Sequence, residues 1–259
     1  MATDNFYLTL PSNSSMASFP NNTLSHYITA LKRPIELEGD WEVALVSMQY
    51  PTRWANIGPD YCRFQAKTEG GEWRETGVPP GYYGSNEDIV KAVNDALYSA
   101  HADAGMDQQP VQYNKYDEKA YIKLHPQFSI HLFDGIAQVL GYQKATTIKG
   151  PDWATPDYGV DVNHGVHCLY VYCDLVDDQI VGDSTVKVIQ TIPLKHQPGV
   201  VRPLATYFHM VNPHYVPVSK RNTHTVEIHI RDDTGRDISF IAGKVITKLH
   251  FRLRRPHFL

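Results

Sequence analysis

Histidine and cysteine side chains come close together at one point of this sequence, where they could form a metal site. His164, His167 and Cys168 are near neighbours, and Cys173 follows five residues after Cys168. Imidazole nitrogen and thiolate sulfur are ligands that zinc prefers, provided that they converge on one ion. The strand expected here would put His167 and Cys173 on one face and Cys168 on the other. We therefore predict no metal site and no cofactor, and we interpret the cysteines as small core side chains.

A second group of candidate ligands is acidic and consists of Asp174, Asp177, Asp178 and Asp183. Carboxylate oxygens at this density could hold calcium, but the spacing is not that of an EF-hand loop. A pair of them could also serve a hydrolase as acid and base, although nothing in the sequence separates the two roles. We interpret the group as a solvated turn and leave cation binding open.

Known catalytic motifs are absent from the sequence. It contains no GxSxG, HExxH, Walker A or GxGxxG element, which removes the strongest reasons to propose an enzyme. The 13 histidines are scattered along the chain, as expected without a shared site. We predict that the protein is not an enzyme. A cupin-like metal enzyme is an alternative that bound metal in the purified protein would reveal.

The sharpest charge feature is a basic run formed by Lys248, Arg252, Arg254 and Arg255. Such cations could contact packaged DNA through its phosphates, or an acidic neighbouring subunit through its carboxylates. They could equally be an ordinary solvated chain end, because they are few and the formal net charge of the chain is −4. Both interpretations stay open.

The composition favours a globular β-rich protein. The 259 residues are 42% hydrophobic and 11% aromatic, and aromatic side chains suit a pleated, half-buried surface. Three cysteines argue against a disulfide scaffold and fit a reducing compartment. The first residues do not resemble a signal peptide, and no apolar run approaches the ~20 residues that span a bilayer. We therefore expect a protein that is not secreted.

Hydrophobic patterning predicts many strands and one main helix. Residues 224–231 and 245–253 alternate between apolar and polar side chains, so each strand should have one buried and one solvated face. Residues 41–50 are apolar on both alternating sets, which predicts a central, covered strand. Ser85 resembles a helix cap, and an apolar stripe follows it over about 86–101. Further strands are expected at 24–31, 61–66, 72–75, 111–116, 120–125, 166–176, 186–193 and 205–211, with a short helix at 134–140.

These elements predict an all-β protein. They contain no repeated βα unit, which argues against a parallel doubly wound sheet. A single jelly-roll antiparallel β-sandwich, with long loops and one main inserted helix, fits best. We expect an extended N-terminal arm at 1–22, in which Phe6–Leu10 could form a short strand, and a single jelly-roll domain with loop insertions at 23–259. Residues 144–165, rich in Gly, Pro, Asp and Thr, are expected to form a long loop.

An ordered set of segments across most of the chain resembles one protein family. The set includes LPSNSSM (10–16), FPNNTLS (19–25), PIELEGDWEVAL (34–45), PGYY (80–83), LYVYCDLV (169–176) with VGD (181–183), NPHYVPV (212–218) and EIHIRDDTG (227–235). Together these segments resemble the penton, or minor capsid, protein of Polinton/Maverick-type elements and adintovirus-like viruses.

The resemblance implies a structural protein that forms homopentamers at the vertices of an icosahedral capsid. It implies neighbours made of a double jelly-roll major capsid protein, assembly inside the host cell, and a final location in the virion. Related adenovirus-type vertex proteins can carry an Arg-Gly-Asp loop for receptors, whereas here Val181-Gly182-Asp183 lacks the arginine. The alternative function is a carbohydrate-binding β-sandwich, in which aromatic side chains such as Trp73 or Trp153 would stack on sugar.

Overall fold

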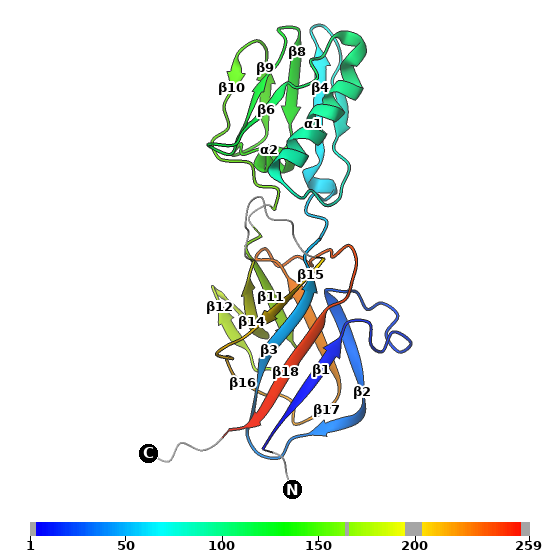
Figure 1. Ribbon diagram of the computed structural model, residues 1–259, viewed down its shortest axis with the longest axis vertical. Helices are drawn as coiled ribbons and strands as arrows, with labels where there is room; N and C mark the ends of the chain where they lie inside the picture. Colours follow the sequence, from blue (N-terminus) through cyan, green and yellow to red (C-terminus); the bar gives the residue numbers. More distant parts are fainter. Residues whose placement is uncertain (1–3, 164–165, 195–203, 255–259) are drawn as a thin grey trace. The chain divides into compact units, whose positions relative to one another are not determined.

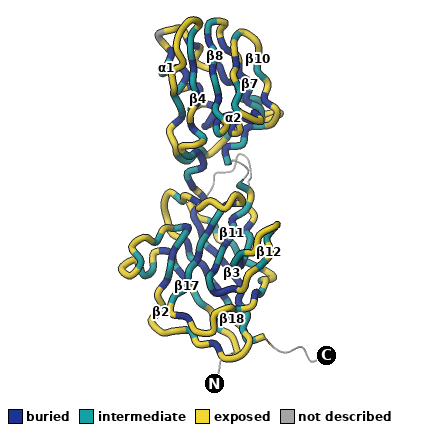
Figure 2. Tube along the Cα trace, turned by 180° about the vertical axis from the view of Figure 1, so that it is seen from behind, coloured by how far each residue is buried: buried dark blue, intermediate teal, exposed yellow. Residues whose placement is uncertain are grey.

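The chain folds into two compact units, one of which is inserted in the sequence of the other. The computed structural model describes residues 4–163, 166–194 and 204–254. The first unit, called here the jelly-roll unit, is built from Met1–Trp54 and Val166–Leu259, and the second, called the inserted unit, is Ala55–Gly165. Each unit has its own hydrophobic core. In both units, the buried residues lie mainly in the strands and the exposed residues lie mainly in the loops (Figure 2).

Two antiparallel sheets make up the jelly-roll unit (Figure 1). In the first sheet the order is β1 (Asn5–Pro11), β18 (Ile246–Leu253), β3 (Trp41–Pro51) and β15 (Ala205–His209), and β16 (Val216–Pro217) also pairs with β3. In the second sheet the order is β14 (Val188–Pro193), β11 (Cys168–Cys173), β17 (Asn222–Arg231) and β2 (His26–Glu36). A separate hairpin joins β12 (Gln179–Val181) to β13 (Ser184–Val186).

The pairing order of these strands is that of a jelly roll. Taken along the chain, the eight main strands are β1, β2, β3, β11, β14, β15 with β16, β17 and β18. The first pairs with the last, the second with the seventh, the third with the sixth and the fourth with the fifth. Such nested pairing folds a long hairpin over into two facing sheets. The all-β antiparallel architecture predicted from the sequence is therefore confirmed.

The strand patterns explain where the core of the jelly-roll unit lies. Val226, Ile228 and Ile230 of β17 are fully buried, while the residues between them are partly exposed. Leu249 and Phe251 of β18 face the same interior. As expected for a central strand, β3 lies between β18 and β15 and is buried along most of its length.

A buried hydrogen bond links the two sheets through this core. The Tyr27 hydroxyl on β2 lies 2.7 Å from the Thr247 hydroxyl on β18 and donates to the carbonyl of Leu10 on β1. Tyr27 and Thr247 are 1% and 0% exposed. Burial raises the pKa of Tyr27 well above its usual range, so the hydroxyl stays protonated and available as a donor.

Removing one partner of this hydrogen bond should leave the other hydroxyl buried without that bond. We expect Tyr27→Phe to lower the free energy of unfolding of the jelly-roll unit by about 1–3 kcal/mol, because the Thr247 hydroxyl loses its partner. The double variant Tyr27→Phe/Thr247→Val should cost less than the sum of the two single changes. Denaturant unfolding of the four proteins measures this coupling, and strictly additive losses would show that the two hydroxyls do not act as a pair.

The inserted unit combines two further antiparallel sheets with helices. One sheet has the order β5 (Arg74–Gly77), β4 (Arg63–Thr68), β8 (Phe128–Leu132) and β9 (Thr146–Lys149). The other has the order β10 (Trp153–Ala154), β7 (Lys119–Lys123) and β6 (Val111–Asn114). The helices are α1 (Asn86–His101), α2 (Asp134–Val139) and the short 3-10 turns η1 (Pro59–Tyr61) and η2 (Ala102–Ala104).

Helix α1 begins where the sequence predicts. The Ser85 hydroxyl accepts a hydrogen bond from the Asp88 N–H, and Ile89, Val93 and Leu97 are fully buried. The polar residue Asn94 of α1 is buried as well. Its amide donates to the Val111 carbonyl and accepts from the Val111 N–H, both at 2.9 Å. The side chain thus pairs with the start of β6 as a neighbouring strand would.

The predicted division into an arm and one domain differs from the structure in two respects. Residues 55–165 form a compact unit of their own and do not act as loop insertions in one domain. Within the expected arm 1–22, strand β1 pairs along its whole length with β18, and Phe6 stacks on Phe251 at 4.7 Å. Alternating side chains fix β1 onto its own sandwich, so it does not extend as a free arm.

Several short strands were missed. The expected loop at 144–165 contains β9 and β10, which have only four and two residues. Strand β8 was not predicted, although Phe128, Ile130 and Leu132 alternate and are fully buried. The hairpin β12–β13 lies at the surface, where strand patterning is weak.

Candidate subunit-contact surfaces

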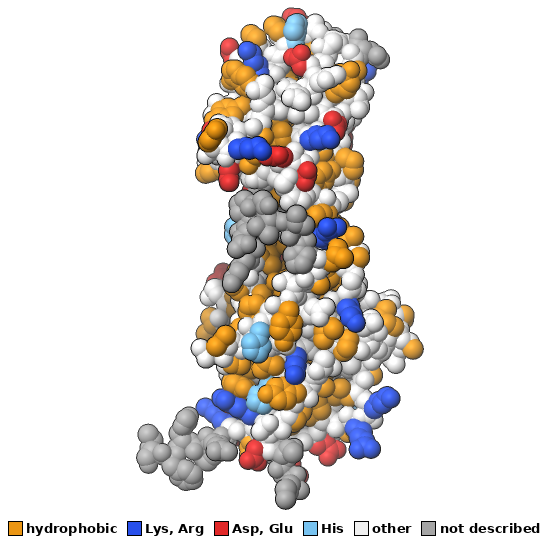
Figure 3. Space-filling model, in the orientation of Figure 1, with side chains coloured by type: hydrophobic (Ala, Val, Ile, Leu, Met, Phe, Trp, Pro, Cys, Tyr) orange, Lys and Arg blue, Asp and Glu red, His pale blue; other side chains and the backbone are white. Residues whose placement is uncertain are grey.

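The outer face of the first sheet gathers aromatic and cationic side chains. Strand alternation turns Tyr7 of β1 and Lys248, His250 and Arg252 of β18 away from the core, while Leu249 and Phe251 point inward. The register places Tyr7 opposite His250. Tyr215, which precedes β16, joins them through His250. We call these five residues the aromatic–cationic face. Figure 3 shows histidine, basic and hydrophobic side chains together on this side of the jelly-roll unit.

Ring contacts hold the aromatic–cationic face together. The rings of Tyr7 and His250 stack at 4.4 Å, and the Lys248 ammonium lies 4.7 Å from the centre of the Tyr7 ring. The Arg252 guanidinium lies 3.5 Å from the centre of the Tyr215 ring. Such cation–π contacts contribute about 0.5–1 kcal/mol at exposed sites and more once desolvated. The face is therefore ordered before any partner covers it.

The protonation of His250 fits this arrangement. Burial, and then the nearby Arg252 charge, lower the pKa of His250 below its usual value. The neutral ring that this favours has an acceptor nitrogen, and the Tyr215 hydroxyl lies 2.7 Å from Nδ1. The Tyr215 hydroxyl can then donate a hydrogen bond to His250, while the Tyr215 ring makes a cation–π contact with Arg252.

The structure describes three of the four cations of the predicted basic run. Lys248 and Arg252 belong to the aromatic–cationic face, where Arg252 also forms an ion pair with Glu42. Arg254 is exposed, and its backbone N–H donates to the carbonyl of Asp40 at 2.7 Å. Arg255 lies outside the described residues. Strand β18 thus places Lys248 and Arg252 on the outer surface of the first sheet.

A second exposed feature is the β12–β13 hairpin with the turn before it. This segment, residues 177–186, is called here the acidic hairpin because Asp177, Asp178 and Asp183 all belong to it. Asp178 lies 3.7 Å from the Lys187 ammonium. The Ile180 side chain is 84% exposed.

Among the described residues, the candidate cation ligands considered from the sequence do not form a cluster. Asp174 accepts a hydrogen bond from the Glu227 N–H at 2.8 Å and forms an ion pair with Lys220, so it is committed to structure. His164 lies outside the described residues, and His167 is exposed. Cys173 is buried, which raises the pKa of its thiol to about 12. This placement agrees with the interpretation of Cys173 as a core side chain.

Another group of metal-binding residue types does converge, and the sequence analysis missed it. Within the described part of the chain, it consists of His26, His229 and Asp237, whose ligand atoms all lie within 4.8 Å of one another. The histidines are more than two hundred positions apart, so only the pairing of β2 with β17 brings them together. The alternation of His229 with buried isoleucines was the one available sign that it faces outward.

The two tryptophans of the carbohydrate-binding alternative are partly exposed but separate. The Lys67 ammonium lies 4.8 Å from the centre of the Trp73 ring, and the Lys123 ammonium lies 5.4 Å from the Trp153 ring. Trp153 belongs to β10, whereas Trp73 adjoins β5 of the other sheet. Lysine side chains thus lie over rings that a sugar would need, and the rings form no shared platform.

Comparisons with known proteins bear on the fold. No family model matches the sequence, and no curated protein matches it. Among solved structures, the crystal structure of the mavirus penton protein is similar, with a TM-score of 0.54 and 14% sequence identity. The match covers 96% of this chain and 99% of that one. Among the described residues, no helix is long and apolar enough to cross a membrane. The chain therefore shares the fold of a viral penton protein over almost its whole length.

Proposed function

We propose that this protein is the penton, or minor capsid, protein of an icosahedral virus-like particle and has a structural role. The observation that carries the proposal is the likeness in fold to the mavirus penton protein over both chains. The match includes the inserted unit as well as the jelly roll, because 96% of this chain is covered. The ordered segments that resemble Polinton/Maverick and adintovirus-like pentons support the same role.

The proposed assembly is a ring of five copies at the capsid vertex. A closed ring needs a heterologous interface, in which one surface of a subunit meets a different surface of the next. The jelly-roll unit offers two unlike surfaces, the aromatic–cationic face and the acidic hairpin. Their opposite charges and their exposed Tyr7 and Ile180 side chains suit such a contact. We therefore propose that these two surfaces meet between neighbouring subunits.

The remaining partners follow from the same role. Double jelly-roll major capsid proteins would surround the ring in the virion, after assembly inside the host cell. Packaged DNA is a candidate partner for Arg254, an exposed cation of the basic run. No catalytic activity is part of this proposal.

The native mass of the purified full-length protein tests the ring. Native mass spectrometry, or light scattering after size exclusion, should give a pentamer. A trimer would point to a different capsid position and would contradict the vertex role. A monomer at all accessible concentrations would mean that the ring does not form from this protein alone, and reconstitution with the major capsid protein would then be the deciding assay.

Reversing one charge on the aromatic–cationic face should weaken the ring. We expect Lys248→Glu to raise the concentration at which the pentamer dissociates by about tenfold or more, which corresponds to about 1.4 kcal/mol. The matched control is Lys91→Glu, which makes the same charge change at an exposed position of α1. Mass photometry over a dilution series measures both proteins. Equal dissociation of the two variants would place the interface elsewhere.

A further inference from the structure

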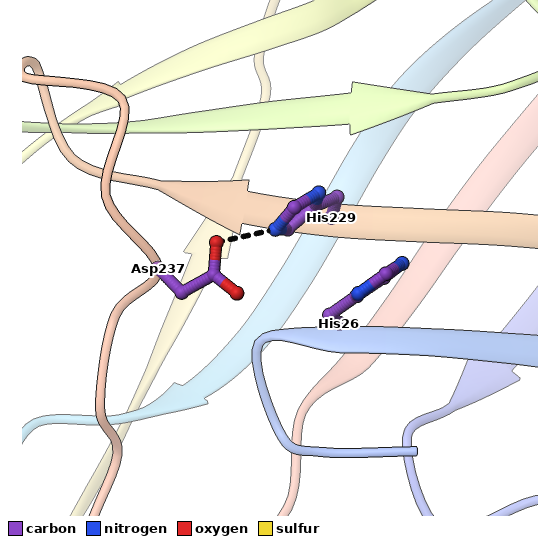
Figure 4. Close-up of side chains that lie close together, drawn as sticks. All are labelled: His26, His229 and Asp237. Atoms are coloured by element: carbon purple, nitrogen blue, oxygen red, sulfur yellow. Dashed lines mark hydrogen bonds and ion pairs between the residues drawn. The ribbon is translucent and has the colours of Figure 1, made fainter. Parts of the chain in front are cut away.

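The outer face of the second sheet holds a compact group of imidazole and carboxylate side chains. His26 on β2 and His229 on β17 are directly paired across the strands. Their rings stack with centres 4.2 Å apart and planes 13° from parallel. Asp237, in the segment after β17, is brought alongside by a β-bridge to Arg231. Figure 4 shows the Asp237 carboxylate directed at His229, with the His26 ring beside it.

The distances are close to those of a metal site. His229 Nε2 lies 2.6 Å from Asp237 Oδ1, and all three ligand atoms lie within 4.8 Å. Zinc bonds of about 2.0–2.1 Å in a tetrahedron require ligand atoms roughly 3.3 Å apart. Ligand atoms as far apart as 4.8 Å would therefore have to approach by about 1.5 Å, and His229 Nε2 and Asp237 Oδ1 would have to separate by about 0.7 Å. Side-chain rotation can supply both movements because His26 and Asp237 are 41% and 54% exposed.

The surrounding groups suit a cation. Glu227 Oε1 lies 2.6 Å from His26 Nε2 and brings a second carboxylate to the same place. Two carboxylates balance the charge of a dication, and a carboxylate beside a metal-binding imidazole also fixes the orientation of the ring. The His229 side chain is only 14% exposed.

We propose that His26, His229 and Asp237 bind a transition-metal dication of the zinc class, with Glu227 beside them. Two imidazole nitrogens and a carboxylate oxygen favour zinc, cobalt, nickel or copper over calcium and magnesium, which prefer oxygen ligands alone. The ion would join β2, an edge strand, to β17 and to the segment that follows it. This site is independent of the proposed ring contact, because it lies on the other sheet.

Arg231 is the competing cation at this site. Its Nε lies 3.2 Å from His229 Nε2 and 3.6 Å from Asp237 Oδ1. The guanidinium therefore occupies the position of the metal charge and must move away when an ion binds. Tyr172, whose ring centre is 5.4 Å from the Arg231 guanidinium, offers a place to which it can withdraw. Arg231→Gln should accordingly tighten metal binding.

Cobalt and zinc titrations of the untagged, chelator-treated full-length protein test the proposal. We expect one Co²⁺ per chain, with the visible d–d absorption typical of four-coordinate cobalt. Zn²⁺ should displace the Co²⁺, and added Zn²⁺ should raise the Tm of the protein. His229→Gln and Asp237→Asn should each weaken binding by more than about tenfold. His224→Gln is the matched control, because it removes an exposed histidine from the same strand and should leave binding unchanged.

The outcomes of these titrations either support the metal site or overturn it. Circular dichroism first shows that the variants are folded, and Arg231→Gln provides a gain of affinity that misfolding cannot imitate. Binding lost in His229→Gln and Asp237→Asn but kept in His224→Gln supports the site. The proposal would be overturned by a wild-type protein that binds neither Co²⁺ nor Zn²⁺ at about 100 μM metal, a concentration well above the dissociation constants of structural zinc sites. Stoichiometric binding that survives in His229→Gln would overturn it as well.

Discussion

Replacing Gly135 with alanine is expected to destabilise the inserted unit strongly while the jelly-roll unit keeps its stability. A β-carbon at position 135 would lie 2.0 Å from the carbonyl oxygen of Asp60 and 2.8 Å from the Cα atom of Tyr61. Both are backbone atoms of η1, which packs against α2, so neither can swing away as a side chain would. We expect a loss of about 3 kcal/mol or more from the stability of the inserted unit, at the upper end of overpacking costs.

Hydrogen exchange read by mass spectrometry can separate the two units in this test. Peptides from 55–165 should lose protection in Gly135→Ala, and peptides from β3, β17 and β18 should keep it. The control is Gly58→Ala, because a β-carbon there meets no atom within 4 Å and the backbone is not left-handed. If both units lost protection together, the division into two units that fold separately would be wrong.

Replacing Phe251 with alanine should destabilise the jelly-roll unit and leave the inserted unit unaffected. Phe251 lies in an inner strand of the first sheet and is 0% exposed. Its ring stacks on the Phe6 ring, with centres 4.7 Å apart and planes 4° from parallel. Truncating a buried phenylalanine costs about 3–5 kcal/mol. Because Phe6 loses its partner, strand β1 should be the first segment to gain exchange.

Denaturant unfolding gives the size of the Phe251→Ala effect, and hydrogen exchange gives its location. Thr9→Ala, an exposed change on the outer face of β1, is the control and should stay within about 0.5 kcal/mol of the wild type. A loss of less than about 1 kcal/mol in Phe251→Ala would contradict the tight packing of this core.

Strands with one buried face could be predicted from the sequence, because burial itself imposes the alternation. Residues 224–231 and 245–253 illustrate this, and the structure places them in the central strands β17 and β18. Helix α1 could be predicted for a similar reason, since Ser85 and the apolar stripe are local signals. The alternation at 128–132 was equally visible and could have been used.

The division into two units could not be predicted, because strands and turns look alike in both. What separates the units is which strands pair, and those partners are far apart in the sequence. The same reason hides the His26–His229 pair, which depends on the register of β2 against β17. The buried role of Asn94 was also hidden, since an amide that pairs with a distant backbone has the same helical spacing as one that faces water.

Functional prediction from residue spacing was limited in the same way. Lys248 and Arg252 were singled out as cations, but their neighbours Tyr7 and Tyr215 come from other strands and loops. The aromatic–cationic face is therefore a product of the tertiary fold. A ring interface can be proposed only after those side chains have been placed on one surface.

The pairing of β1 with β18 has a consequence for the order of events during synthesis on the ribosome. Ser12 and Val245, which are hydrogen-bonded at the end of this pair, are 233 positions apart in the sequence. Strand β1 must therefore wait for nearly the whole chain to be translated, at about 5–20 residues per second. The inserted unit is continuous in sequence and can fold during that delay. Meanwhile the apolar strand β3 has no sheet partner, so a chaperone that shields nascent strands should raise the yield of folded protein.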